Sequence, residues 1–591
     1  MFPTQCNEPL RPTAGDPGAR RRRATGVALL VLALPAVYFL SLAPRTGRLQ
    51  WHDYYVVLME MVDGDHLRSD VLGWLTIKSN EHAVAVPALV YAANAALFHG
   101  DNRTLAALAV LCQFAVALSV FAFLGEGARR SASRGAASAA VIGGLAFTPV
   151  GAHQFVLGFS GVMWIVADLL AVSAILSLCR AARRPRQTQA MAIAIAAAVA
   201  GAFTFSTALA VWPALLLGVA LLPRLRRYGP AVVAAALVTG LAAVALYHRP
   251  THHPSLVVAR PGALLEFVAS FLGWIFTSNR TLAAGLGACG LLACLATWWL
   301  TLRSEDAESK ARLAPWLLLQ VYGGANAAMA AVARSGFGRG AAEQHRYGLL
   351  AGLFWLGVFG AAAQLLAAVP ERRRRVPASV LLACIAGAAV TATWVQGAGA
   401  ARRLLADAAW HPFAEIAVRY ELADDSAFRR FQNVDARTWL DGPGRAVLPF
   451  LRRNAQVPFD RDPRPRFGDV LADDMIAGES VPHPGGMVTR ATPLDARILT
   501  VEGRIDTGGR AADRVVAVAV DGTVLGELAV VPAASLTVAP ARAHAVLVAG
   551  YAAPRTPGEP LHLAVRLRGE RLFHVIGKPW TRTAHGEASP L

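Results

Sequence analysis

The residues best suited to chemistry lie in the segment 44–103, which is rich in ionisable and aromatic side chains. Asp53 comes early in this segment, and Glu81 and His82 come later. Connections longer than about 12 to 15 residues usually carry function or structure of their own, so these three residues are candidate catalytic groups. Each also has a structural alternative. Asp53 could cap a helix starting near Tyr54, and the other two could form a cap and a solvated pair.

A second candidate group consists of Arg334, Arg339 and Arg346, which lie in one short connection between two apolar runs. The planar guanidinium group binds phosphate through paired hydrogen bonds. Arg334 and Arg346 therefore predict a lipid-phosphate site. The alternative is a loop whose arginines extend toward the membrane surface or pair with Glu343.

Two isolated features add to the candidates. Asp168 is an acidic residue well inside an apolar run, and an ionisable residue within a membrane indicates function by default. A hydrogen bond to a neighbouring helix would satisfy it equally well. His252 and His253 resemble metal ligands, but adjacent side chains on a regular element point in different directions, which favours a polar turn.

The elements that must position these residues are long apolar helices. A helix that crosses a membrane needs about 20 mostly apolar residues. Eight runs reach or approach that length: 24–43, 105–124, 160–178, 230–247, 281–302, 313–332, 348–369 and 378–395. Three shorter runs also qualify: 136–150, 190–203 and 208–222. The sequence therefore predicts about eleven membrane spans.

Arginine clusters alternate along the chain in a way that predicts orientation. They occur at residues 20–23, 129–134, 180–186, 224–227 and 372–375, in alternate connections between the apolar runs. Because such clusters stay on the cytoplasmic side, we expect a cytoplasmic amino terminus and an extracytoplasmic carboxyl-terminal region. The net charge of +18 then reflects topology and contact with anionic lipid, and no nucleic-acid motif occurs.

The predicted fold is mainly α: a polytopic transmembrane helical bundle with a carboxyl-terminal extracytoplasmic β-sandwich. We expect a basic tail at 1–23, the membrane domain at 24–397 with its external loop at 44–103, an external helical segment and Pro-rich linker at 398–484, and the β-sandwich at 485–591. Helices at 54–62, 84–98 and 264–276 are expected at the membrane surface. Asp521 and Gly522, between two runs of alternating apolar residues, predict a β-hairpin.

Together these features resemble the GT-C superfamily of polyprenyl-phosphate-sugar-dependent glycosyltransferases. The stretches Ser79–Leu89, Phe205–Pro213 and Arg334–Tyr347 resemble a poorly characterised bacterial subgroup related to it, and the likeness covers roughly residues 20–400. Abundant Ala, Arg and Gly also indicate a GC-rich bacterial genome, so the membrane we expect is the bacterial cytoplasmic (inner) membrane.

The resemblance implies transfer of a sugar from a polyprenyl-phosphate donor to an envelope glycan, lipid or protein acceptor at the outer face. It makes Asp53 the expected base or metal ligand, with Glu81 and His82 as second candidates, because the superfamily keeps an acidic residue just after its first span. Arginine or a divalent cation such as Mg²⁺ or Mn²⁺ would stabilise the leaving phosphate. Superfamily members often have two adjacent acidic residues there, whereas this chain has His52 and Asp53.

Two other classes of protein compete with the enzyme. A transporter or flippase for a lipid-linked saccharide would need polar residues near the membrane midplane and paired half-repeats. Asp168, Gln320 and Asn326 are few for that role, and no inverted repeat is visible. A non-catalytic membrane protein whose external sandwich binds envelope glycan is the third class.

The alternating arginine clusters give a direct prediction of topology. Reporter fusions after Arg186, Arg227 and Arg375 should behave as cytoplasmic, and fusions after Gln396 or at the carboxyl terminus as extracytoplasmic. Paired alkaline phosphatase and fluorescent-protein fusions would measure this. A cytoplasmic carboxyl terminus would contradict an odd number of spans.

Overall fold

The computed structural model describes residues 17–590, apart from 80–81, 125–131, 184–185, 247–260, 433, 461–468, 472–485, 496, 508–509, 532–544, 557 and 583–587. Four features of the sequence lie outside the described residues. These are Glu81 of the candidate catalytic group, the His252 and His253 pair, most of the Pro-rich linker, and the tail before residue 17.

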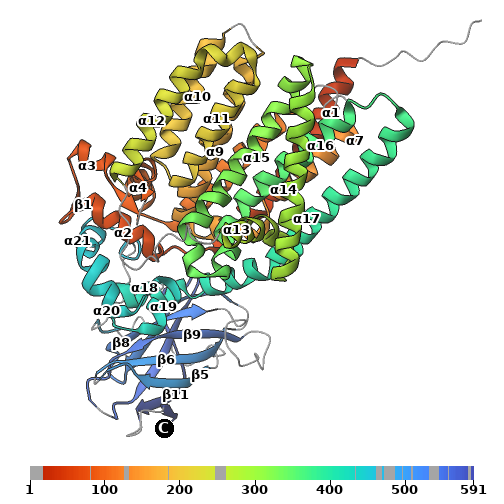
Figure 1. The fold of residues 1–591 in the computed structure, drawn as a ribbon. Coiled ribbons are helices and arrows are strands. Elements are labelled where there is room, and N and C mark those ends of the chain that lie inside the picture. Colours follow the sequence, from red (N-terminus) through yellow and green to blue (C-terminus); the bar gives the residue numbers. More distant parts are fainter. Residues whose placement is uncertain are drawn as a thin grey trace, which may run out of the picture.

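The amino-terminal two thirds of the chain form a bundle of apolar helices, and a β-sheet lies beyond one end of it (Figure 1). Eight helical segments are long and apolar enough to cross a membrane: Arg22–Arg45, Asn102–Phe121, Gly158–Ala181, Pro223–Leu246, Arg280–Arg303, Ala307–Phe337, His345–Ala367 and Arg375–Arg419. Each contains most or all of one of the eight longer runs predicted from the sequence.

The three shorter runs are helices as well: α7 (Ala132–Ala146), α10 (Gln187–Ala202) and α11 (Val211–Leu221). At about 1.5 Å per residue, the longest of them is shorter than the roughly 30 Å of hydrocarbon in a bilayer. The described residues therefore contain eight candidate spans by length and composition. Three further crossings remain a proposal.

Small residues let the helices pack closely, as is usual between apolar helices. Helix α9 (Gly158–Ala181) packs along α5 (Asn102–Phe121), and a Cβ added at Gly161 would lie 2.6 Å from the Ala109 Cβ atom. Between α15 (Ala307–Arg334) and α16 (Gly348–Ala367), a Cβ at Gly357 would lie 2.7 Å from the Trp316 carbonyl oxygen. Larger residues at these positions would separate the helices.

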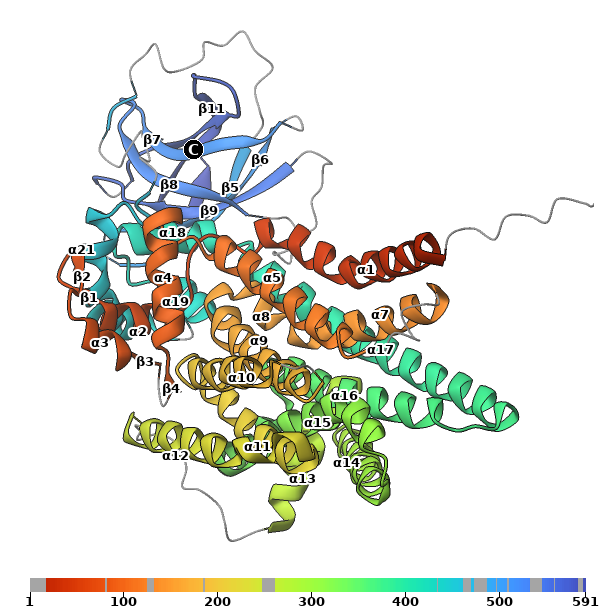
Figure 2. The ribbon, with the colours of Figure 1, turned by 90° about the horizontal axis from the view of Figure 1, so that it is seen from above.

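The connections between helices gather at two opposite ends of the bundle. At one end, Arg183 donates a hydrogen bond to the Ala311 carbonyl, and Arg227 donates one to Gln187 at 2.7 Å, so several arginine-rich connections lie together. The other end, here called the sheet-facing end, carries the helices and strands shown between the bundle and the β-sheet in Figures 1 and 2. The charge pattern of the sequence thus corresponds to two distinct ends of the fold.

Helix α17 (Arg372–Ala408) joins the bundle to the sheet-facing elements. With 37 residues it is about 55 Å long, more than a membrane requires, and it continues through the predicted domain boundary at residue 397. The external helical segment follows as α18 (His411–Arg419), α19 (Asp425–Gln432), α20 (Ala436–Trp439) and α21 (Arg445–Arg453). The helices predicted at 54–62 and 84–98 are α2 (His52–Met61) and α4 (Ala85–Phe98). The helix predicted at 264–276 corresponds over most of its length to α13 (Pro261–Gly273).

The carboxyl-terminal domain is one eight-stranded antiparallel sheet, with strands in the order β12-β11-β10-β7-β8-β9-β6-β5. The strands are β5 (Gly486–Pro493), β6 (Leu499–Asp506), β7 (Ala512–Ala519), β8 (Val524–Val531), β9 (Ala545–Ala552), β10 (Leu561–Leu567), β11 (His574–Arg582) and β12 (Ala588–Pro590). Strands β11 and β12 contact β5, so the sheet curls on itself like a barrel where the sequence predicted a two-sheet sandwich. Alternating apolar residues predicted strands at 498–505, 515–520, 524–530, 545–548, 561–567 and 571–576, and β6 to β11 overlap these runs in that order. The β7–β8 turn contains Asp521 and Gly522, with Gly522 at a φ of +79°.

The sheet is attached to the bundle through α18, which packs against β8 and β9. Arg419 donates two hydrogen bonds to Glu527, at 2.8 and 2.9 Å, and the Tyr551 hydroxyl donates one to Asp424 at 2.7 Å. Phe413 stacks on Tyr551 with the ring centroids 5.0 Å apart. Burial and the Asp424 charge raise the pKa of Tyr551, so its hydroxyl remains a donor.

A buried arginine holds several segments together at the sheet-facing end. The Arg48 side chain is only 12% exposed, and it lies 3.6 Å from Asp101 and 3.8 Å from Glu415 and is paired with Asp460. Asp101 also caps α5 and is bonded by Arg103. Because the three carboxylates come from the α4–α5 turn, from α18 and from the segment after α21, one guanidinium joins the amino-terminal loop to the carboxyl-terminal region.

Arg48→Met should destabilise the protein strongly, because removing one partner of a buried ion pair leaves the other, here Asp460, without its paired charge, at a cost of about 3–5 kcal/mol. A lower melting temperature in detergent and faster proteolytic release of the carboxyl-terminal region would show this. Arg45→Met is the matched control, because Arg45 is exposed and exposed substitutions usually change stability by about 0.5 kcal/mol or less. Equal melting of the two variants would exclude the proposed role of Arg48.

Candidate functional site

Several segments of the chain, among them the Arg346 turn, bond to the first two turns of α9 or to their neighbours, at the sheet-facing end of the bundle. The Gly158 amide donates to Asn102 at 2.8 Å, and the Tyr91 hydroxyl donates to the Phe159 carbonyl at 2.8 Å. The Ser160 hydroxyl donates to the Gln154 side chain at 2.7 Å, and the Gln154 amide donates to the Arg346 carbonyl at 3.4 Å. We call this group of residues and their neighbours the α9 site.

Asp53 lies in the first turn of α2, with an exposed side chain. The N-cap of α2 is Trp51, which makes no side-chain capping bond, so Asp53 does not cap the helix. An acidic residue in the first turn still interacts favourably with the helix dipole. Burial, the neighbouring Tyr54 and the Asp53 charge together raise the pKa of Tyr91, so Asp53 acts electrostatically on a residue that bonds directly to α9.

His82 reaches α9 through a line of aromatic rings. It lies in β4 (His82–Ala83), which pairs with β3 (Lys78–Ser79), and is therefore not in a helix cap. The His82 and Phe205 ring centroids are 4.1 Å apart, and those of Phe205 and Trp164 are 4.8 Å apart. Trp164 lies 5.9 Å from Tyr347. Three sequence stretches that are far apart in the chain thus meet around Trp164.

Arg346 lies at the other end of this line of rings. Its guanidinium is exposed, lies 5.9 Å from the Tyr347 ring centroid and donates to Gln344. The His345 Nδ1–H donates a hydrogen bond to the Val150 carbonyl, 3.2 Å away, and Arg403 of α17 lies within electrostatic reach of His345. Burial, reinforced by the Arg346 and His345 charges, lowers the pKa of His153 to about 3, so this ring is neutral at physiological pH.

Arg334 is less exposed than Arg346. Its residue is half-buried, and its guanidinium lies 5.7 Å from the Phe337 ring centroid. The Arg339 side chain is not among those described. Glu343, the alternative partner proposed for these arginines, instead pairs with Arg280 at 3.1 Å.

Asp168 lies deeper in the bundle, one turn of α9 beyond Trp164, and is 1% exposed. The Tyr322 hydroxyl of α15 donates to it at 2.6 Å. Asn326, one turn further along α15, bonds back to the Tyr322 carbonyl at 3.1 Å. The hydrogen bond to a neighbouring helix, which is the structural alternative for Asp168, is therefore present.

Sequence reasoning missed Trp164 and His153. Trp164 precedes Asp168 by four residues and so lies on the same face of a helix, which was the available signal. His153 is a lone histidine in a short connection and carried no signal of its own. Its place beside Arg346 depends on the contact between the segment around Val150 and the Arg346 turn, and no local pattern encodes that contact.

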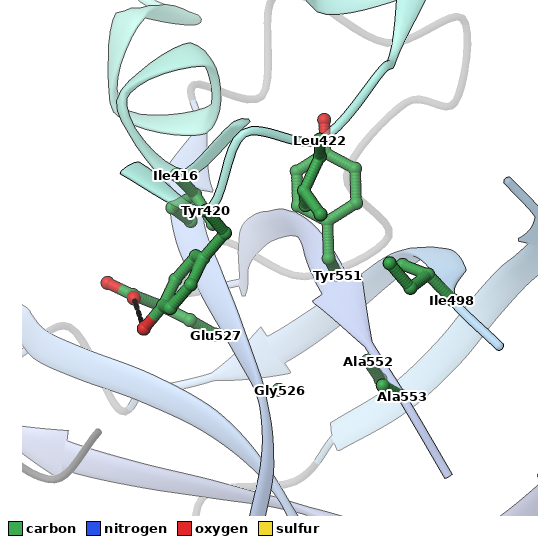
Figure 3. Close-up of a pocket in the computed structure, with 9 residues that line it drawn as sticks. All are labelled: Ile416, Tyr420, Leu422, Ile498, Gly526, Glu527, Tyr551, Ala552 and Ala553. Carbon is green, nitrogen blue, oxygen red and sulfur yellow. Dashed lines mark hydrogen bonds between the residues drawn. The ribbon is translucent and has the colours of Figure 1, made fainter. Parts of the chain in front are cut away.

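Two cavities lie outside the α9 site. The first has a volume of about 210 Å³ and lies between α18 and the sheet (Figure 3). Its polar side chains bond to one another or to nearby residues, as Tyr420 does to Glu527 at 3.1 Å. The second, of about 660 Å³, lies between α1 (Pro17–Leu42), α7 and α17. Neither is lined by Asp53, His82 or Arg346.

Among the described residues, no group of three or more His, Cys, Asp or Glu side chains could hold a metal ion. Asp53 is the one candidate carboxylate at the α9 site for which a position is described. A Mg²⁺ or Mn²⁺ site needs several oxygen ligands. Glu81 lies outside the described residues, and a divalent cation stays a prediction.

Comparison of the chain with protein-family models, curated proteins and solved structures finds no match. The class is therefore defined by the fold: the part of the chain that the structure describes is mostly helical, with eight candidate membrane spans and a carboxyl-terminal, barrel-like sheet domain. Its apolar helices have the character of a membrane protein.

Proposed function

We propose that the protein is a GT-C-type membrane glycosyltransferase that transfers a sugar from a polyprenyl-phosphate donor to a glycan, lipid or protein acceptor of the bacterial envelope. The observation that carries the proposal is the grouping of Asp53, His82 and Arg346 around the first turns of α9. A carboxylate, an imidazole and an exposed guanidinium lie on three segments around the start of α9, at one end of an apolar bundle.

Each residue has a role in this reaction. Asp53 accepts the proton of the acceptor hydroxyl, and the acceptor oxygen forms the new bond to the anomeric carbon. The bond from that carbon to the donor phosphate breaks, and the polyprenyl phosphate leaves with the electron pair. Arg346 stabilises the charge of the departing phosphate through paired hydrogen bonds. His82, and Glu81 beside it in the sequence, are the second candidates for the base.

The proposed location is the bacterial cytoplasmic membrane, with the sheet-facing end outside. The arginine-rich connections at the opposite end support this orientation, since such clusters stay cytoplasmic. The long lipid chain of the donor would then lie beside the bundle, and its phosphate would meet the α9 site at the membrane surface. The sheet domain would face the envelope, where an acceptor is found.

A transporter of a lipid-linked saccharide is the second candidate. The Asp168–Tyr322 pair favours it, because a buried carboxylate inside the bundle is the kind of polar group that transporters place near the midplane. The two candidates differ in one measurable way. The enzyme makes a new glycosidic bond in detergent, whereas a transporter only moves its substrate across a sealed membrane.

Asp53→Asn should lower sugar transfer by about 100-fold or more, because a general base typically contributes at least that factor. Membrane insertion and melting temperature should stay nearly unchanged, since the side chain is exposed and is not the helix cap. Transfer of a radiolabelled sugar from a polyprenyl-phosphate donor by the purified protein measures this. Asp63→Asn is the matched control, because Asp63 is exposed in the same loop. Full activity of Asp53→Asn would exclude Asp53 as the base.

Arg346→Lys should weaken binding of a polyprenyl phosphate almost as much as Arg346→Ala, by about 10-fold or more. A lysine ammonium acts as a point charge and lacks the paired donors of a guanidinium. Binding to the protein in nanodiscs measures the affinity, with the exposed Arg373→Ala as the control. Equal affinities of wild type and Arg346→Ala would remove Arg346 from the site and weaken the transferase proposal.

A further inference from the structure

The cavity between α1, α7 and α17 forms a groove of about 660 Å³ on the side of the bundle. That volume lies within the range of about 300–1,000 Å³ found for small-molecule sites. Its walls are almost entirely apolar, with Leu34 from α1, Ala140 from α7 and Val395 from α17 among them. The groove is therefore suited to a hydrocarbon chain.

Tight packing between α7 and α17 forms one side of this groove. A Cβ added at Gly144 would lie 2.5 Å from Val390, so only glycine allows this approach. The Trp394 indole donates to the Gly144 carbonyl at 3.0 Å, and the Thr391 hydroxyl donates to Gly387 within its own helix at 3.0 Å. Both polar groups are satisfied by the protein and leave an apolar surface.

One end of the groove carries positive charge. Arg402 lines it and is exposed, and Arg403 follows directly. Among the described residues, neither arginine has a carboxylate partner within salt-bridge distance. From Val390 to Arg402, α17 rises by about 18 Å, close to the roughly 15 Å depth of one leaflet. With Val390 near the bilayer midplane, Arg402 would lie at the depth of a phospholipid headgroup.

We propose that this groove is a binding site for an anionic phospholipid of the leaflet at the sheet-facing end, with an acyl chain between α1, α7 and α17 and the phosphate at Arg402. The site goes beyond the proposed transferase function and depends only on the bundle lying in a membrane. A net negative headgroup is favoured over a zwitterionic one because Arg402, the charged residue that lines the groove, meets it.

Trp394 provides a local probe of this site. The purified full-length protein would be placed in phosphatidylcholine nanodiscs containing a small fraction of either dibrominated phosphatidylglycerol or dibrominated phosphatidylcholine, since bromine on an acyl chain quenches tryptophan fluorescence on contact. The quenching of Trp394 is obtained by subtracting the fluorescence quenching of the same protein carrying Trp394→Phe from that of each protein. We expect the anionic lipid to quench Trp394 at least threefold more than the zwitterionic lipid at the same fraction.

Substitutions distinguish recognition of the lipid headgroup from binding of the acyl chain. Arg402→Ala should make the two lipids quench equally, whereas Arg303→Ala, an exposed arginine at the far end of α14 (Arg280–Arg303), should keep the preference. Ala140→Phe, which fills the groove from an exposed position, should lower quenching by both lipids. Ala288→Phe, a substitution at another exposed position, on α14, should leave quenching by both lipids unchanged.

Three results would overturn the proposal. Equal quenching by the two lipids in the wild type would remove the headgroup preference, and a preference retained in Arg402→Ala would place it elsewhere. Displacement of the brominated phosphatidylglycerol by an equimolar amount of a polyprenyl phosphate would make that lipid the occupant instead. Soluble glycerol phosphate should not compete, because the chain in the groove supplies most of the contact.

Discussion

The buried guanidinium of Arg48 is the constraint on which the arrangement of this protein depends. It lies among Asp101, Glu415 and Asp460 with all four side chains 11–13% exposed, and a buried charge is tolerated only when it is paired. The partners come from segments more than 300 residues apart. Separating the helical bundle from the carboxyl-terminal region would therefore break the pairing of Arg48 with Glu415 and Asp460.

This fixed connection explains why the α9 site lies at the end of the bundle that faces the sheet domain. The turns at Arg48, Asp101 and Val150 are held together there. The Asn102 side chain donates to the Gly47 and Val156 carbonyls and accepts a hydrogen bond from the Gly158 amide. The rings around Trp164 are positioned by the same turns. A site in which a base and a cation face the same substrate needs neighbouring residues that hold both side chains in place.

The phospholipid groove and the α9 site are related through α17. Gly397 packs against the segment at Pro149 and Val150, which also accepts the hydrogen bond of His345. Arg402 follows little more than one turn later at the end of the groove, and Arg403 lies near His345. A lipid in the groove would thus present its headgroup to the same face of the bundle on which the proposed transfer takes place.

The sequence by itself determined the elements. Apolar length identified the eight long helices, period-two alternation identified six strands and the Asp521–Gly522 turn, and the alternating arginines separated the two ends of the bundle. These signals are local, because each depends on residues within one helix or strand. The tertiary structure decided what depends on distant contacts: that α17 continues past residue 397, that the sheet closes on itself, that Asp53 does not cap α2, and that Trp164 and His153 join His82 and Arg346. Those outcomes follow from packing between segments far apart in the chain, which a local sequence pattern does not record.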